Sequence, residues 1–127
     1  MTIWKGRSKK KPTGGRYWPW RKKREREIGQ DPELASLGKK ASKQKRTTGG
    51  GTRTALVKAE YANVADKGVI KKAKILDVVE NVASRHFVRK DIITKGAILK
   101  TEIGLARVAS RPTREGVVNA VLVKEKK

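Results

Sequence analysis

The chain has 127 residues, with 33 lysines and arginines against 12 aspartates and glutamates, so its formal net charge is +21. It has no cysteine and one histidine, His86, which excludes a disulfide framework, a cysteine nucleophile and a zinc site made of cysteines or several histidines. No apolar run approaches the roughly 20 residues that span a membrane, and no apolar stretch of the signal-peptide kind follows the first basic residues. We therefore expect a soluble intracellular protein that binds a polyanion.

The chain divides into two kinds of sequence near Thr54. Residues 1–54 hold 17 basic and 4 acidic residues but only 4 large aliphatic residues, whereas residues 55–127 hold 24 large aliphatic or phenylalanine residues. Because ordering a residue costs roughly 1–2 kcal/mol of backbone entropy, only the second part has enough apolar surface to fold alone. We expect residues 1–54 to be an extended basic arm and linker that orders on a partner, and residues 55–127 to be one small domain.

The arm shows only short local signals. The segment Trp20–Ile28 has Arg21–Glu25 and Lys23–Glu27 pairs four residues apart and a following Gly29, which predicts a helix that forms mainly when bound. Asp31 and Pro32 then resemble the start of a helical turn or two that includes Leu34 and Leu37. Residues 39–53 are rich in lysine, serine, threonine and glycine, which indicates a flexible linker.

The second part is predicted to consist of short strands separated by tight turns. Alternating or β-branched segments are found at Ala55–Tyr61, Lys71–Glu80, Arg85–Arg89, Ala97–Ile103, Leu105–Ser110 and Val117–Val123. The pair of segments around Gly104 predicts a hairpin, and the nearly continuous apolar run Val117–Val123 predicts a strand buried on both faces. We therefore expect a mainly β protein, a small six-stranded β-barrel with an extended basic N-terminal arm that contains short helical turns.

The basic runs carry the clearest functional signal. Lysines and arginines that reach a nucleic acid release its condensed counterions, so binding is strong and depends on salt. A solubilising surface or a nuclear-import signal would give a similar composition, but the net charge is large for either. A DNA-compacting architectural protein is the main alternative to an RNA-binding protein.

Four aromatic residues lie among these arginines in a region with no core: Trp4, Tyr17, Trp18 and Trp20. They can stack on bases or guanidinium groups, or pack back onto the barrel and anchor the arm. The sequence leaves both possibilities open. Splayed bases are more typical of folded RNA than of duplex DNA, which favours RNA.

No constellation of catalytic residues is visible. Gly14 and Gly15, like the run Gly49–Gly51, would allow a close backbone approach to phosphate, but neither cluster fits a nucleotide-binding P-loop, so a turn or linker is the simpler interpretation. His86 lacks a partner that would make it a base, and we expect it at the surface or facing RNA. We expect no enzymatic activity, no cofactor, no metal ion and no small-molecule substrate.

The spaced motif Thr13-Gly14-Gly15, Arg21-Lys22-Lys23 and Glu27-Ile28-Gly29 resembles the signature of the ribosomal protein S8e family of the small subunit. Further matching segments are Gly6–Ser8, Ala59–Asn63, Lys72–Asn81, Ile93–Ala97, Ser110–Pro112 and Gly116–Ala120. The length is similar to that of the short archaeal members. The resemblance implies a small β-barrel with an N-terminal extension, located in the cytoplasm on the ribosome. It further implies binding to the 5′ region of small-subunit ribosomal RNA, in the body of the subunit, beside other small-subunit ribosomal proteins.

On this hypothesis the basic side chains neutralise RNA phosphates and do not contact a membrane. The expected contacts are Arg7, Lys9, Lys10, Lys11, Arg16, Arg21, Lys22, Lys23, Arg24, Lys43, Lys45, Arg46 and Arg53 in the arm and linker, and Arg85, Arg89, Lys95 and Arg111 in the barrel.

Overall fold

The computed structural model describes residues 3–4, 6–29 and 31–123 and divides the chain into two compact units. The first unit ends at Pro32 and the second begins at Glu33. This division falls earlier than Thr54, where the composition changes, because Thr54 lies within a strand of the second unit.

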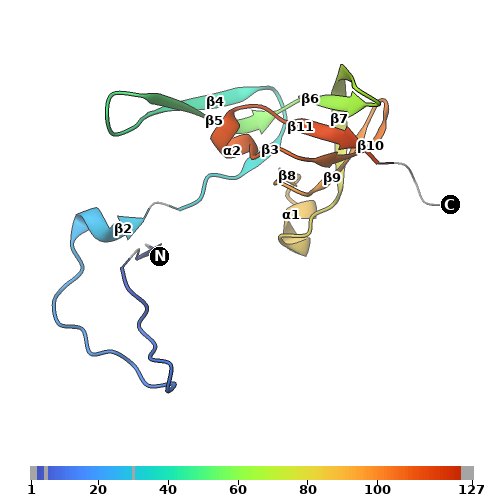
Figure 1. Ribbon diagram of the computed structural model, residues 1–127. Helices are drawn as coiled ribbons and strands as arrows, with labels where there is room; N and C mark the ends of the chain where they lie inside the picture. The colour runs from blue at the N-terminus through green and yellow to red at the C-terminus, as the bar shows by residue number, and fades with distance from the viewer. Residues whose placement is uncertain (1–2, 5, 30, 124–127) are drawn as a thin grey trace. The chain divides into compact units, whose positions relative to one another are not determined.

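The N-terminal unit is a long loop whose two ends pair (Figure 1). Strand β1 (Ile3–Trp4) lies antiparallel to β2 (Ile28–Gly29), and a single 3-10 turn, η1 (Glu25–Glu27), precedes β2. Within Trp20–Ile28 this turn is the one helical element of the chain by itself; the helix expected there mainly in the bound state stays a prediction. The segment has no apolar stripe to bury, and tertiary burial is what stabilises most short helices.

The second unit contains a closed barrel of five strands in the order β10-β11-β6-β7-β9. Its strands are β6 (Tyr61–Asp66), β7 (Val69–Glu80), β9 (Ile98–Thr101), β10 (Gly104–Val108) and β11 (Asn119–Leu122). All neighbours are antiparallel except β11 and β6, which are parallel. The mainly β class and the barrel are confirmed, as is the hairpin around Gly104, but the barrel has five strands where six were expected.

A four-stranded sheet in the order β4-β5-β3-β8 belongs to the same unit. Its strands are β4 (Ala41–Arg46), β5 (Thr52–Ala59), β3 (Ala35–Leu37) and β8 (Ile92–Ile93). The predicted flexible linker over residues 39–53 was wrong, since it forms β4 and the turn of a long hairpin that projects beyond the barrel (Figure 1). The predicted helical turn that includes Leu34 and Leu37 was also wrong, because Ala35 is fully buried between β5 and β8.

Two four-residue helices complete the second unit. Among the described residues, no helix is long and apolar enough to cross a membrane. Helix α1 (Arg85–Val88) replaces the strand predicted over Arg85–Arg89, because the Ser84 hydroxyl accepts a hydrogen bond from the His86 backbone and begins a helix there. Helix α2 (Pro112–Glu115) ends at Gly116, whose φ of +76° favours glycine.

A buried asparagine joins the end of β7 to β8. The Asn81 side chain donates to the carbonyl of Ile92 at 2.9 Å and accepts from the Thr94 hydroxyl at 2.8 Å and the Ala83 backbone at 3.0 Å. With these bonds Asn81 is only 6% exposed. These hydrogen bonds fix the connection between the barrel and the second sheet. Losing one of them would leave a buried polar group of Asn81 without a partner, which is costly.

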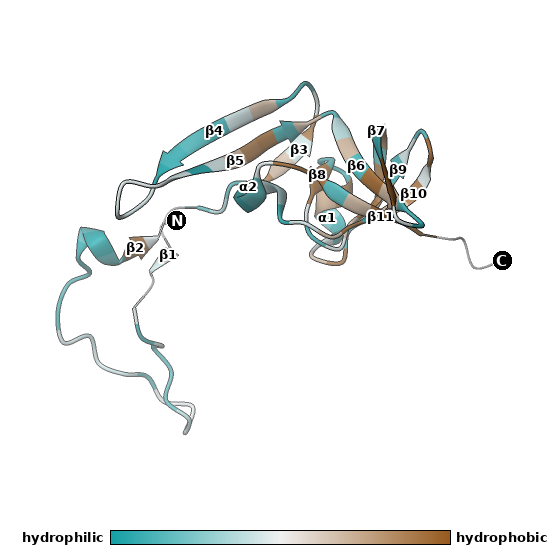
Figure 2. Cartoon of the chain, turned by 45° about the horizontal axis from the view of Figure 1, so that its top comes forward, coloured by the Kyte–Doolittle hydropathy of each residue, from teal (hydrophilic) through white to brown (hydrophobic). Residues whose placement is uncertain are grey.

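The core is made largely of small side chains, as a narrow barrel requires. The buried cluster is Leu56, Ala59, Ala62, Val64, Ala73, Ile75, Val78, Ile93, Ala97, Leu99, Ala106, Val108, Val118 and Ala120. Hydrophobic residues accordingly gather in the barrel strands, whereas the N-terminal loop and the far end of β4 are hydrophilic (Figure 2). The expectation that Val117–Val123 is buried on both faces was wrong, since Val121 is 52% exposed on the outer face.

The turn between β6 and β7 predicts a stabilising substitution. Asp66 pairs with Val69, and the two turn residues have φ of +45° at Lys67 and +89° at Gly68. Lysine disfavours this conformation, which asparagine adopts readily. We expect Lys67→Asn to raise the free energy of unfolding by about 1 kcal/mol in urea denaturation. Lys67→Ala removes the same charge and should leave the free energy of unfolding without this increase. An equal increase in Lys67→Ala would show that loss of the charge, and not the backbone conformation, stabilises the protein.

Candidate nucleic-acid interface

The loop of the N-terminal unit, residues 6–24, concentrates exposed positive charge. Residues 1–32 hold eleven lysines and arginines and three acidic residues. Among the described residues of this unit, Arg21 and Glu27 form the one ion pair. The expected contacts that lie exposed in this loop are Arg7, Lys9, Lys10, Lys11, Arg16, Lys22, Lys23 and Arg24. Their charges are therefore available to an anion.

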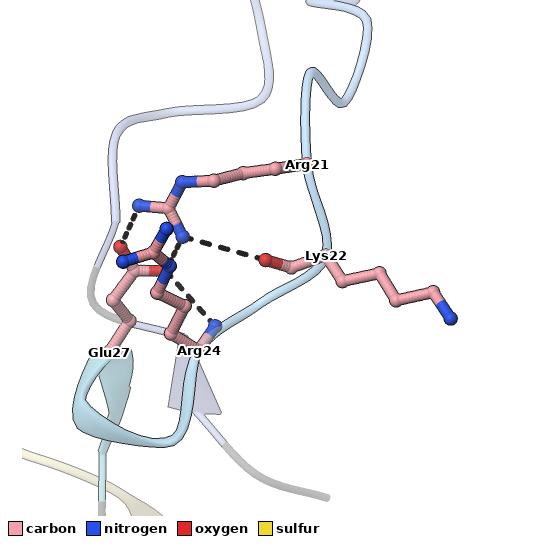
Figure 3. A network of polar contacts seen from close by, with 4 residues as sticks. All are labelled: Arg21, Lys22, Arg24 and Glu27. Atoms are coloured by element: carbon pink, nitrogen blue, oxygen red, sulfur yellow. Dashed lines mark hydrogen bonds and ion pairs between the residues drawn. The ribbon is translucent and has the colours of Figure 1, made fainter.

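The carboxylate of Glu27 organises the base of the loop (Figure 3). Both of its oxygens accept from the Arg21 guanidinium, with Nη1 donating to Oε2 at 3.1 Å. Oε2 also accepts from the backbone N–H of Arg24 at 3.3 Å. The hydrogen bonds from Arg21, followed by that from Arg24, lower the pKa of Glu27 from 4.5 to about 2. The sequence predicted partners four residues apart, Arg21 with Glu25, but the extended chain brings Arg21 to Glu27 instead.

Trp4 packs inside the N-terminal unit. It is half-buried and its ring lies over Gly6, where a Cβ would be only 2.1 Å from the ring carbon Cζ2. Lys23 Nζ lies 6.0 Å from the centre of the ring. This aromatic residue therefore acts as a local anchor, and Gly6 is required because any side chain there would collide with the indole.

The other three aromatic residues are exposed on the loop. The Arg7 guanidinium lies 3.8 Å from the centre of the Tyr17 ring, and that of Arg21 lies 4.5 Å from the centre of the Trp20 ring. Trp18 and Trp20 are 90% and 84% exposed. Large exposed indoles between cations are the arrangement that binds single-stranded or splayed bases.

Gly14 and Gly15 form a tight turn at the tip of this loop. The Lys11 backbone N–H donates to the Gly15 carbonyl at 2.8 Å, and the Gly14 N–H donates to the Lys11 carbonyl at 3.0 Å. An isolated antiparallel bridge between Lys10 and Arg16 continues the turn. The turn places the three lysines of residues 9–11 opposite Arg16, so the tip is strongly basic.

The β4–β5 hairpin is a second basic element, which the sequence interpretation treated as linker. Lys43, Lys45 and Arg53 lie on one face, since Lys45 pairs directly with Arg53 in the register. Glu33 accepts from Lys45 Nζ at 2.8 Å and lies 3.6 Å from Lys43 Nζ. The hydrogen bond from Lys45, opposed by partial burial, leaves the pKa of Glu33 lowered. Glu33 thus holds two like charges side by side, and Arg46 follows toward the hairpin turn.

The remaining expected contacts lie at separate places in the second unit. Arg85 and Arg89 are exposed on and just after α1, beside an exposed His86. Lys95 lies in the turn before β9, and Arg111 precedes α2. No described hydrogen bond or ion pair joins the side chain of Lys95 or Arg111 to α1. In the described part of the chain, no group of three acidic, histidine or cysteine residues could hold a metal ion.

Comparison with known proteins identifies similar sequences along almost the whole chain. The model of the family described as ribosomal protein S8e matches residues 4–123. A protein of Methanocorpusculum labreanum is 46% identical over 123 residues, covering 95% of this chain and 98% of the relative. A protein of Methanosphaerula palustris is 47% identical with the same coverage, and one of Methanospirillum hungatei is 48% identical over 122 residues, covering 94% and 98%. All three are named small ribosomal subunit protein eS8.

The Glu27 contacts predict how the loop responds to acid. Because the pKa of Glu27 is about 2 in the folded loop and 4.5 ordinarily, the unfolded loop binds the proton first as the pH falls. The contribution of the ion pair to closing the loop is therefore complete above about pH 4.5 and is lost as the pH falls toward 2. NMR titration of the Trp4 indole and Arg21 side-chain signals measures this. Glu27→Gln should abolish the transition, and a midpoint near 4.5 would contradict the pairing.

Proposed function

Because the chain belongs to the ribosomal protein S8e family, we propose that it is a structural constituent of the small ribosomal subunit that binds and stabilises small-subunit ribosomal RNA. The proposed site is the 5′ region of that RNA, in the body of the subunit, within the cytoplasmic ribosome. Family membership also supports a structural role in place of an enzymatic one. Other small-subunit ribosomal proteins are the proposed neighbours.

The single observation that carries the proposal is the loop of residues 6–24. It combines exposed cations that pair with no described carboxylate and two indoles that are 90% and 84% exposed. Cations bind the phosphates of any nucleic acid, whereas exposed indoles gain most from unstacked bases, which folded RNA offers and duplex DNA does not. The combination therefore favours structured RNA over duplex DNA.

The β4–β5 hairpin and the cations around α1 extend the proposed contact surface. Lys43, Lys45 and Arg53 present a row of charge along a hairpin with no acidic residue between positions 41 and 59. Such contacts hold RNA segments in position and do not read their sequence. We propose that the loop and the hairpin each bind where RNA backbones converge, since several phosphates in one place need several cations.

The salt dependence of binding tests the loop as the main electrostatic anchor. If about ten phosphates are neutralised, the affinity of the full chain for a 5′-region ribosomal RNA fragment should fall with a log–log slope near −7 to −9. Replacing Arg7, Lys9, Lys10 and Lys11 by glutamine should make that slope shallower by about 3 to 4. The matched control replaces Lys71, Lys72, Lys74 and Lys100 of the barrel and should change it little.

Two outcomes would contradict the proposal. A slope shallower than about −3 for the unaltered chain would exclude the loop as the anchor. Binding to duplex DNA at equal phosphate concentration that matches or exceeds binding to the RNA fragment would favour an architectural DNA-binding protein instead.

The exposed indoles predict that removing one of them lowers the affinity for RNA by an amount that does not depend on salt. Trp18→Ala should weaken binding to the RNA fragment by about 1–3 kcal/mol, the range for one base stacked on an aromatic ring, with the salt slope unchanged. Trp18→Phe keeps a stacking surface and should recover most of the affinity. Equal loss in both variants, or no loss in either, would show that the indole does not stack on a base.

A further inference from the structure

The outer face of the barrel carries a row of apolar side chains that no described residue covers. The register places Ile70 of β7 opposite Ala65 of β6, and Ala65 beside Val121 of β11. Ile70 is 71% exposed and Val121 is 52% exposed. Val64 and Ala120, the neighbours in sequence of Ala65 and Val121, are buried in the core, whereas Val69 beside Ile70 is 58% exposed, so the row is not part of the core.

Cations border this row. Arg107 of β10 is the direct partner of Val121 in the register. Arg107 and Val121 also line a shallow hollow together with Lys95 and Val82, and Val82 is 77% exposed. The surface therefore has an apolar centre formed by Ile70, Ala65, Val121 and Val82, and a basic edge formed by Lys95 and Arg107; we name it the barrel patch.

We propose that the barrel patch docks a segment of another protein in which apolar side chains are flanked by carboxylates. An apolar centre with a charged edge is the usual anatomy of a protein–protein interface, and contiguous exposed apolar side chains mark such sites. Phosphates alone would leave the methyl groups of Ile70, Val82 and Val121 without a partner. The inference rests on the proposed place of the chain in a ribonucleoprotein.

The net charge of the chain and the closed topology of the barrel limit which partners the barrel patch can bind. A second copy of the chain would bring a further net charge of +21 and the same basic edge, so repulsion disfavours self-association. The strands of the patch belong to a closed barrel, and a closed barrel offers no free edge for an added strand. The partner therefore binds through its side chains, with carboxylates placed against Lys95 and Arg107.

The absence of cysteine from the sequence permits a site-specific test. Val121→Cys in the full chain is coupled to a benzophenone maleimide, assembled into purified small ribosomal subunits and irradiated. Leu76→Cys, at a β7 position that is 49% exposed and outside the row, is the matched control. Nuclease and protease sensitivity separate RNA adducts from protein adducts, and mass spectrometry identifies the linked peptide.

We expect Val121→Cys to give a nuclease-resistant adduct with an acidic peptide that contains apolar residues, and Leu76→Cys to give none. Adding Arg107→Glu should remove most of that adduct, because it places like charges together. An RNA adduct, an adduct with a second copy, a basic peptide, or equal labelling from both positions would overturn the inference. Failure of the labelled chains and also of the unaltered, unlabelled chain to enter the subunit would instead contradict the proposed function.

Discussion

Closure of the barrel is the constraint on which the rest of the structure depends. An exposed sheet edge invites association, and a chain with 33 basic residues and few large apolar ones has little with which to cover such edges. The closed barrel has no edge, whereas the open sheet β4-β5-β3-β8 keeps two. The five strands of the barrel pair in a ring, and alanines such as Ala62, Ala73 and Ala106 fill its narrow interior. The barrel thus needs few large side chains and leaves the cations outside.

Two carboxylates then arrange part of that charge. Glu27 binds the Arg21 guanidinium and the Arg24 backbone at the base of the N-terminal loop, and Glu33 holds Lys43 and Lys45 on the hairpin. Neither neutralises its surroundings: Glu33 faces two lysines, and Glu27 pairs with one arginine in a loop whose other cations stay exposed. Their effect is to order basic side chains before an anion arrives, which reduces the entropy that binding must overcome.

Local signals predicted much of this molecule. Alternation and turns located β7 and the β9–β10 hairpin, since those patterns depend on neighbours in sequence. The strand β4 was missed because every residue in it except the half-buried Lys45 is exposed, so it has no apolar face to alternate with a polar one. The strand β3 was missed because its three residues pair with distant strands. In the candidate site, the composition alone predicted the cations. The Arg21–Glu27 ion pair could not be predicted, because it depends on the path of an irregular loop and not on a regular spacing in the sequence. The arm was predicted as extended and basic, but the anchor that Trp4 forms over Gly6 depends on a contact that no spacing rule describes.

Hydrogen exchange of the free chain and of its complex with a ribosomal RNA fragment tests the central claim most directly. The account predicts slow exchange at the core-facing strands β6, β7, β9, β10 and β11 in both states, because their amides are paired in the closed ring. It predicts fast exchange over residues 6–24 in the free chain and slowing there only when RNA is bound. Slow exchange across that loop without RNA, or fast exchange in the barrel until RNA is added, would contradict it.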